Sequence, residues 1–277
     1  MTNKLACIVL TKDEEKNIGT CLANLKWVDE LFIVDSGSTD TTLQIAERYD
    51  ANIFINRMNP FIISEQRNWA IHNCPIRSEW ILFIDADEII TDSLKKEILF
   101  KIDNNENKLA FRLCFKFIFM GKWLKHTVQF PSWHDRLLKK GFIYFTGGVW
   151  EHFDCEDDKI GYINEPYLHY GFNNGISGWI DKHNRYSTAN AQRIFEYKKQ
   201  KINWRILFKN ALNNRNRKRE LEKILSRMPI LFPFVTFFYL YFIKRGFWEG
   251  LAGFVYSLML SANNFFMWLK VRELEDR

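Results

Sequence analysis

Three acidic residues directly follow a short apolar run, and their types and spacing suit a divalent cation. Residues 80–84 are apolar and are followed by Asp85, Ala86, Asp87 and Glu88. A short apolar run between turn-like segments predicts a strand that is buried on both faces. Because side chains alternate along a strand, Asp85 and Asp87 would lie on one side and Ala86 on the other. Two carboxylates at such a strand end favour a cation that keeps its other positions for diphosphate oxygens. The structural alternative is the start of a helix, where a carboxylate such as that of Glu88 is favourable.

Two other polar residues follow strands that precede this one in the chain. Thr11 ends the apolar run 5–10, and Asp35 ends the run 31–34. A carboxylate at such a position can accept a hydrogen bond from a base N–H or a ribose hydroxyl. Thr11 and Glu14 also have the spacing of a helix capping box. Asp35 before Ser-Gly-Ser also fits an Asx turn. At this point both the binding roles and these local roles stay open.

The elements that would position these residues alternate between strands and helices. Helices are predicted over residues 15–25, from 41 to about 49 and over 64–73, and a short strand over 52–56. Strands that alternate with helices indicate βαβ units and a parallel sheet. After Asp92 the pattern changes to a helix and then to aromatic-rich strands over 109–119 and within 134–145. We therefore predict an α/β fold with a mostly parallel sheet, an antiparallel extension and a C-terminal helical region.

The charge and the apolar pattern divide the chain near residue 177. We expect residues 1–177 to form one domain and residues 178–277 a basic helical region, which holds 19 Lys and Arg against 8 Asp and Glu. Its apolar stretches, 228–243 and 251–269, are respectively short and rather polar for spanning helices. Cationic helices rich in Phe and Trp suit a membrane interface, so we expect peripheral contact with an anionic membrane surface. Buried core helices, a homo-oligomer interface and true membrane spans are the alternatives.

Composition excludes several other classes of protein. The five cysteines are scattered without paired spacing, which argues against a disulfide framework or a zinc site. The polar N-terminus does not resemble a signal peptide. The basic segment 205–227 lacks a recognisable nucleic-acid module, so we predict no nucleic-acid partner.

Four short motifs, in order, resemble family 2 glycosyltransferases with a GT-A fold. They are TKDE at residues 11–14, IVDSGSTD at 33–40, QRN at 66–68 and DADE at 85–88. Two later motifs, GGVWEH at 147–152 and RGFWEG at 245–250, resemble the branch that contains lipopolysaccharide core β-glucosyltransferases. The resemblance covers nearly the whole chain, and four motifs in the right order make it specific.

The resemblance implies a role for each candidate residue. Glu151 would be the catalytic base, with Asp135 and Glu88 as competing candidates. A divalent cation, Mg²⁺ or Mn²⁺, would be held by Asp87, Asp85 and His169. The nucleotide sugar would be bound by residues of all four motifs and one later arginine, namely Thr11, Glu14, Asp35, Arg67, Asp85, Ala86, Asp87 and Arg136.

The implied activity is that of an inverting, metal-dependent hexosyltransferase. It would move a hexose, with glucose favoured, from a UDP-sugar donor to a lipid-linked saccharide acceptor such as the lipopolysaccharide inner core. The enzyme would be cytoplasmic and peripherally associated with the inner face of the cytoplasmic membrane. Two alternatives remain at this point: a polyprenyl-phosphate sugar transferase of the same fold, and a non-catalytic nucleotide-binding membrane or interaction protein.

Overall fold

The computed structural model describes residues 4–105, 107–148, 151–199 and 231–276, without the side chains of residues 189, 193 and 197. The predicted basic segment 205–227 and residues 228–230 of the first apolar stretch lie outside these ranges. The chain separates into two compact units. Unit 1 is Met1–Ile118 with Phe130–Asn174, and unit 2 is Phe119–Gln129 with Gly175–Arg277.

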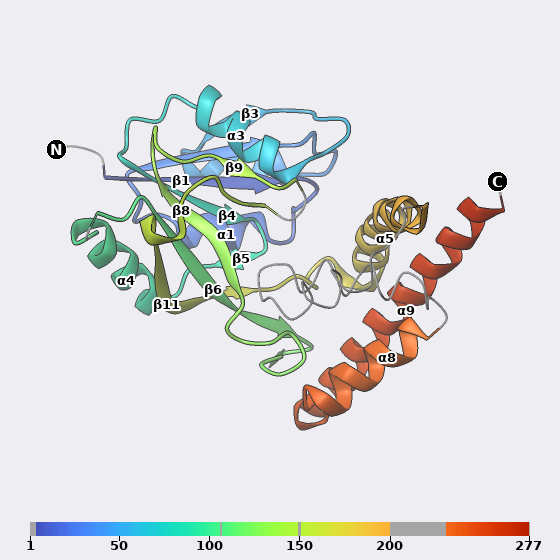
Figure 1. The fold of residues 1–277 in the computed structure, drawn as a ribbon. Helices are drawn as coiled ribbons and strands as arrows, with labels where there is room; N and C mark the ends of the chain where they lie inside the picture. Colours follow the sequence, from blue (N-terminus) through green and yellow to red (C-terminus); the bar gives the residue numbers. More distant parts are fainter. Residues whose placement is uncertain (1–3, 106, 149–150, 200–230, 277) are drawn as a thin grey trace. The chain divides into compact units, whose positions relative to one another are not determined.

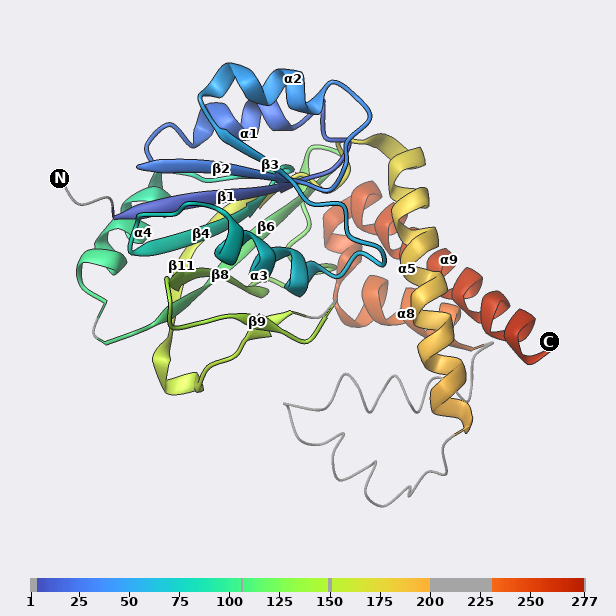
Figure 2. The same cartoon turned by 90° about the horizontal axis from the view of Figure 1, so that it is seen from above.

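Unit 1 is built on a mixed sheet, visible in Figures 1 and 2. Four neighbouring strands are parallel: β3 (Asn52–Ile55), β2 (Glu30–Asp35), β1 (Leu5–Thr11) and β4 (Trp80–Asp85). The sheet continues from β4 through β8 (Trp133–Lys139), β6 (Ala110–Phe119), β11 (Ile160–His169) and β5 (Glu88–Ile89). Every neighbouring pair in this second half is antiparallel except β6 with β11. The predicted fold class, a mostly parallel sheet with an antiparallel extension, is confirmed.

The strand register brings the candidate residues to one edge of this sheet. Thr11 lies opposite Asp35 in the β1–β2 pair, and Leu10 lies opposite Asp85 in the β1–β4 pair. All seven residues of β1 are buried, as expected of a strand covered on both faces. The carboxyl ends of three parallel strands therefore present their polar residues side by side.

Helices cover both faces of the parallel half, as Figure 2 shows. On one face lie α1 (Ile18–Asn24) and α2 (Thr42–Ala46), and on the other lie α3 (Ile63–Asn73) and the short strand β9 (Phe145–Thr146). The main apolar core lies between the sheet and α3, where alternate residues of β1 pack with those of β2, β4 and α3. The remaining elements of unit 1 are two 3₁₀ turns (Glu47–Tyr49 and Asp157–Lys159), α4 (Asp92–Asp103) and β10 (His152–Phe153).

Thr11 and Glu14 do not form the capping box that their spacing allowed. The N-cap residues of α1 and α2 are Asn17 and Thr41, and neither makes a side-chain capping bond. Glu14 accepts a hydrogen bond from the Asn17 side chain at 2.6 Å instead. The physical reason is that the chain turns through Asp13 (φ 53°) after β1, so α1 begins at Ile18 rather than directly after Thr11.

Unit 2 is mainly helical. It contains the short strand β7 (Lys122–Trp123) and the helices α5 (Gly175–Lys199), α8 (Phe232–Phe238) and α9 (Gly250–Glu275). Helix α9 packs against α5 and α8. A π-helical turn (Tyr239–Ile243) and a 3₁₀ turn (Gly246–Glu249) join α8 to α9. Within the residues that the structure describes, we find no helix long and apolar enough to span a membrane.

Candidate active site

The carboxylate of Asp85 lies between two buried arginines. Arg67, from α3, places Nη2 3.3 Å from Asp85 Oδ1, and Arg136, from β8, places Nη2 2.8 Å from Asp85 Oδ2. The arginine side chains are 1% and 3% exposed, whereas the Asp85 side chain is 35% exposed. Burial alone would raise the pKa of Asp85, but Arg136 and Arg67 outweigh it and hold that pKa well below its ordinary value. Asp85 therefore stays ionised and accessible on one side.

A second carboxylate, that of Glu88, contacts both Arg136 and the backbone of Asp85. Its Oε1 lies 2.6 Å from Arg136 Nη2, and its Oε2 accepts a hydrogen bond of 2.9 Å from the backbone N–H of Asp85. The Glu88 side chain is fully buried. Burial raises its pKa to about 7, with the attraction of Arg136 opposing the rise. Glu88 thus positions both Arg136 and the end of β4.

The two arginines have more N–H groups than the cluster uses. Nη1 of Arg67 and both Nη1 and Nε of Arg136 are buried without a hydrogen-bond partner in the described part of the chain. The Arg67 guanidinium also lies near the rings of Phe83 and Phe145, at 5.2 and 5.3 Å from their centroids. Buried donors without partners are rare, so this cluster favours an additional anionic oxygen.

Glu151 completes the cluster on the side of Arg67. Its Oε2 is 2.9 Å from Arg67 Nε, although the two groups are not aligned for a hydrogen bond. The side chain is 18% exposed. Burial raises the pKa of Glu151 above its ordinary value, and Arg67 and Arg136 limit the rise. The result is a partly accessible carboxylate whose proton affinity is increased.

The two competing candidates for the base are less suitable. Both oxygens of Asp135 are in use: Oδ1 lies 2.7 Å from Arg112 Nε, and Oδ2 accepts a 2.5 Å hydrogen bond from the backbone N–H of Phe153. Glu88 is fully buried beneath Asp85. Of the three predicted candidates, Glu151 alone combines partial exposure with contact to the Asp85 cluster.

Asp87 and His169 form a separate pair. Strand β11 places His169 opposite Glu88 in β5, and the backbone N–H of Tyr170 donates to the Asp87 carbonyl at 2.8 Å. His169 Nε2 then lies 3.3 Å from Asp87 Oδ2. A carboxylate and an imidazole fit a cation such as Mn²⁺ or Mg²⁺ that takes its other ligands from a diphosphate.

The predicted metal trio is not assembled as a single group. The described residues contain no cluster of three or more His, Cys, Asp or Glu side chains arranged for a metal ion. Asp85 and Asp87 would share one side only if the strand continued through Asp87, but β4 ends at Asp85 and residues 86–87 form a turn. Asp85 therefore faces the arginines and Asp87 faces His169, while Ala86 is buried.

The loops after β1 and β2 are joined by side-chain hydrogen bonds. The fully buried Asp35 carboxylate accepts from the backbone N–H groups of Gly37 and Ser38, both at 2.7 Å, and from the Ser38 hydroxyl at 2.5 Å. This is the Asx-turn geometry that the sequence left open. Asp13 bridges the loops, since its N–H donates to Ser38 Oγ and its carboxylate accepts from Thr39 N. These bonds fix the shape of the proposed nucleotide side of the site.

Thr11 and Glu14 occupy the same region. The Thr11 hydroxyl is buried, and it has no hydrogen-bond partner in the described residues. Glu14 is half-buried, and its backbone N–H donates to Thr42 Oγ1 at 2.8 Å. The structure thus brings the predicted residues to the carboxyl edge of the sheet in three sets: one around Asp85, the pair of Asp87 and His169, and one in these loops.

Sequence reasoning missed the structural role of Glu88 and the depth at which Arg136 lies. A signal was present, because Arg136 directly precedes Leu137 and Leu138 in an apolar strand, where a charged residue needs a buried partner. It also missed the hydrogen-bonded contact between Tyr167 Oη and His134 Nδ1 at 2.8 Å. Burial lowers the pKa of His134 to about 3, so this histidine is neutral.

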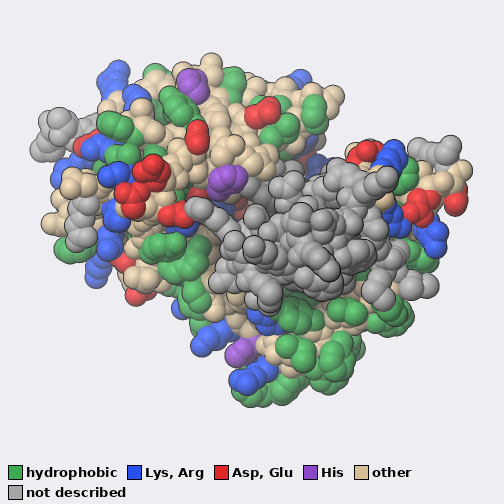
Figure 3. Space-filling view, in the orientation of Figure 1, with side chains coloured by type: hydrophobic (Ala, Val, Ile, Leu, Met, Phe, Trp, Pro, Cys, Tyr) green, Lys and Arg blue, Asp and Glu red, His purple; other side chains and the backbone are tan. Residues whose placement is uncertain are grey.

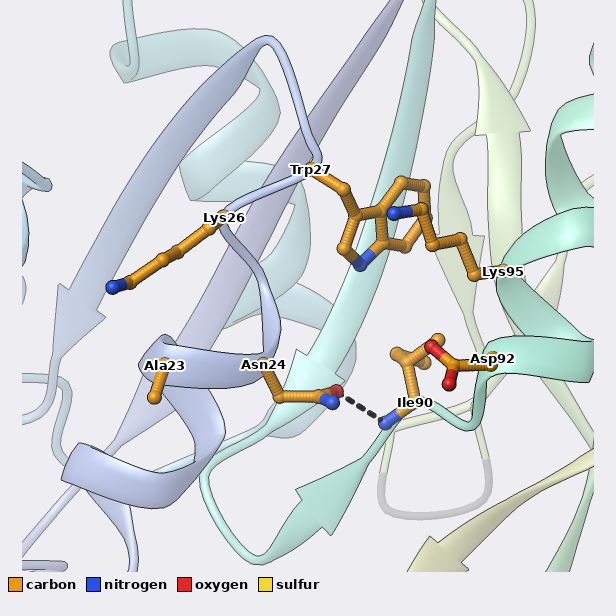
Figure 4. A pocket seen from close by; sticks show the side chains of 7 residues that line it. All are labelled: Ala23, Asn24, Lys26, Trp27, Ile90, Asp92 and Lys95. Atoms are coloured by element: carbon orange, nitrogen blue, oxygen red, sulfur yellow. Dashed lines mark hydrogen bonds between the residues drawn. The ribbon is translucent and has the colours of Figure 1, made fainter.

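A hollow on unit 1 contains none of the predicted site residues. Figure 4 shows that it is formed by the end of α1, the segment after β5 and the start of α4. Asn24 Oδ1 accepts from the backbone N–H of Ile90 at 2.8 Å, and Lys95 Nζ lies 5.5 Å from the Trp27 ring centroid. Asn24 and Lys95 are thus engaged within the protein, and we assign this hollow no part in the chemistry.

Comparison with known proteins gives consistent matches. Residues 6–163 match the family model for glycosyl transferase family 2. An uncharacterized glycosyltransferase of Rickettsia conorii is 28% identical over 287 aligned positions, which cover 99% of this chain and 91% of that protein. A lipopolysaccharide core biosynthesis glycosyltransferase, LpsC of Rhizobium meliloti, is 34% identical over 95 residues, 33% of this chain and 34% of that protein.

Among solved structures, S. aureus TarS 1–349 in complex with UDP-GlcNAc is 21% identical with a TM-score of 0.42, covering 60% of this chain and 58% of that chain. The family model spans more than half of the present chain, and the Rickettsia protein matches it almost from end to end. This chain is a glycosyltransferase, and it belongs to glycosyl transferase family 2.

Proposed function

We propose that this glycosyltransferase moves a hexose, with glucose as the first candidate, from a UDP-sugar to a lipid-linked glycan with inversion at the anomeric carbon. The observation that carries the proposal is the position of Glu151, a partly exposed carboxylate next to the Arg67–Asp85 cluster. Inversion requires one base that activates the acceptor hydroxyl and one region that binds the leaving diphosphate. The site offers a separate group for each task.

Glu151 is the proposed general base. Its pKa is raised by burial, which strengthens it as a proton acceptor, while the nearby Arg67 keeps the ionised form favourable. The acceptor hydroxyl oxygen would attack the anomeric carbon while its proton passes to the Glu151 carboxylate. The bond from the anomeric carbon to the diphosphate would break in the same step. Arg67 therefore links the base to the donor side of the site.

The donor side combines carboxylate and guanidinium groups. Asp85, ionised and open on one side, can accept hydrogen bonds from sugar or ribose hydroxyls. The buried N–H groups of Arg67 and Arg136 supply hydrogen-bond donors of the kind that suits phosphate oxygens. We propose Asp87 and His169 as the protein ligands of a divalent cation, Mg²⁺ or Mn²⁺, which when bound would neutralise the charge of the leaving diphosphate.

The nucleotide is proposed to lie along the loops that follow β1 and β2, near Thr11, Glu14 and Asp35. In the present arrangement Asp35 acts through the loop that it holds, because its carboxylate is buried and bonded to residues 37 and 38. The Glu14 carboxylate is half-buried. We propose that it is the more accessible contact for a ribose hydroxyl.

The acceptor class rests on similarity over a third of the chain. The matched relative is named for lipopolysaccharide core biosynthesis. We propose a lipid-linked inner-core saccharide as acceptor, and we propose that transfer takes place at the inner face of the cytoplasmic membrane.

A donor panel tests the proposal. Purified protein is incubated with UDP-glucose, UDP-galactose or UDP-N-acetylglucosamine, a bacterial lipid extract, and Mg²⁺ or Mn²⁺. UDP release is measured together with sugar incorporation into lipid. We expect one UDP-hexose to support both, and a chelator to abolish them. Tight UDP binding without release or transfer under any of these conditions would instead indicate a non-catalytic nucleotide-binding protein.

A further inference from the structure

One end of unit 2 exposes apolar side chains of the kind that are normally buried. This end, which we call the basic aromatic tip, consists of residues 119–129 and 238–254. Ile243, Trp248 and Leu251 are 62%, 57% and 67% exposed, and Phe242 and Phe247 are exposed as well. Figure 3 shows hydrophobic side chains gathered at this end of α8 and α9, with basic side chains beside them. A contiguous apolar patch of this kind marks a contact surface.

The same tip is cationic, with no exposed acidic side chain among its residues. Its basic residues include Lys122 and Lys125, and the turn between α8 and α9 adds Lys244 and Arg245. Arg245 lies over the Trp248 ring at 5.0 Å, so cation and aromatic ring are presented together. The single acidic residue of residues 119–129 and 231–269 is Glu249, and it is only 3% exposed.

Glu249 is used inside the tip, where it joins the two segments. Its carboxylate accepts hydrogen bonds from the backbone N–H of His126 at 2.6 Å, from the backbone N–H of Thr127 at 3.2 Å and from the Thr127 hydroxyl. Gly246 permits the close approach, since a Cβ there would lie 2.8 Å from the carbonyl oxygen of Leu240 and 3.0 Å from Thr127 Oγ1. The tip is therefore held as one shape whose outer face is apolar and basic.

We propose that the basic aromatic tip inserts into the surface of an anionic lipid bilayer. Trp and Phe suit the headgroup level, Ile243 and Leu251 suit the acyl boundary, and the surrounding cations suit anionic headgroups. A second copy of the chain fits less well, because a symmetric contact would bring the cations of one tip against those of the other. A nucleic acid fits less well too, because aliphatic side chains offer no stacking surface to bases. The inference rests on the proposed function only in that a lipid-linked acceptor is reached at a membrane.

The test is cosedimentation of the full-length protein with vesicles. Vesicles of phosphatidylcholine with about 30% phosphatidylglycerol are compared with vesicles of phosphatidylcholine alone. We expect binding to the anionic vesicles, and binding at least roughly tenfold weaker to the neutral ones, because each cation near the surface contributes about fivefold. The double variant Trp248→Ser/Leu251→Ser should lower the partition coefficient roughly 100-fold, at about tenfold per apolar side chain. Lys122→Gln/Lys125→Gln should lower it roughly 25-fold on the anionic vesicles.

Phe100→Ser is the matched control. Phe100 is 63% exposed on α4 in unit 1, so its replacement removes a comparable apolar surface outside the tip, and vesicle binding should not change. Far-UV and near-UV circular dichroism establish that all variants are folded.

The proposal is overturned if the folded tip variants bind vesicles as the wild type does, or if Phe100→Ser weakens binding equally. It is also overturned if the wild type binds no vesicles; loss of a dimer or of RNA binding in the tip variants would then identify the other occupant of the tip. The assay contains no donor or acceptor, so its outcome is independent of the proposed transfer reaction.

Discussion

Replacing Arg136 by methionine should destabilise unit 1 by an amount that depends on pH. The side chain is 3% exposed and neutralises both Asp85 and Glu88. Methionine removes the charge while keeping most of the apolar length. The variant leaves Glu88 fully buried beside Asp85, with Arg67 reaching only the other oxygen of Asp85.

The expected cost follows from the burial of Glu88. Removing one partner of a buried ion pair costs roughly 3–5 kcal/mol, which for a unit of this size corresponds to about 6–20 °C in Tm. Most of this cost belongs to Glu88, because the Asp85 side chain is 35% exposed and solvent screens its share.

The pH dependence follows from the raised pKa of Glu88. The pKa of Glu88 is about 7 in the folded protein, against an ordinary value of 4.5. Glu88 therefore contributes fully to the free energy of unfolding below pH 4.5, and this contribution is lost as the pH rises through 7. Loss of Arg136 raises the folded pKa further, so the variant continues to lose stability at higher pH than the wild type. Between pH 6 and pH 8 its deficit should grow by about 1 kcal/mol. The lowered pKa of Asp85 has the opposite effect, but only as the pH falls below about 4, outside this window.

Urea unfolding at pH 6 and pH 8, followed by circular dichroism without ligand, measures this effect. Arg77→Met is the matched control, since Arg77 is exposed and should change stability by less than about 0.5 kcal/mol. The double variant Glu88→Gln/Arg136→Met should recover much of the loss and remove its pH dependence. The reasoning is refuted if Arg136→Met lies within about 1 kcal/mol of the wild type at pH 8, or if its deficit shrinks as the pH rises.

Three further predictions concern single groups. Glu249→Ala should lower the free energy of unfolding of unit 2 by roughly 3 kcal/mol in urea titrations, because three donors of the tip lose their acceptor; a change below about 1 kcal/mol would contradict the contacts described. Thr11→Val should leave stability unchanged or raise it by about 1 kcal/mol, since the buried hydroxyl has no described partner; a clear loss in the same titration would show that the hydroxyl is bonded. The pKa of Glu151 is raised above its ordinary value of 4.5, and below this raised pKa kcat/KM should fall about tenfold per pH unit. A profile that stays flat down to pH 4.5 would exclude Glu151 as the base.

The parallel half of the sheet was predictable because its signals are local. Uninterrupted apolar runs gave β1, β2 and β4, and the polar residue after each run marked the edge where Thr11, Asp35 and Asp85 meet. Such a pattern depends on neighbours in the chain. It therefore identifies the strands and their polar ends without any knowledge of tertiary contacts.

The grouping of the carboxylates could not be predicted, because it depends on contacts between distant segments. Asp85 is held by Arg136, which lies 51 residues further along the chain. His169 reaches Asp87 only because β11 pairs with the two-residue strand β5. The capping box of Thr11 and Glu14 did not form although its spacing was correct, because the turn at Asp13 delays the start of the helix.

The central claim, that Glu151 activates the acceptor hydroxyl, is tested most directly by Glu151→Gln. Sugar transfer to the lipid acceptor is measured for this variant and for Glu156→Gln, which alters an exposed carboxylate five residues away. General-base catalysis predicts that Glu151→Gln lowers kcat by roughly 100-fold or more with UDP affinity retained, while Glu156→Gln transfers as the wild type does. Transfer by Glu151→Gln within about tenfold of the wild type would contradict the claim, and would favour an acceptor that is already an anion.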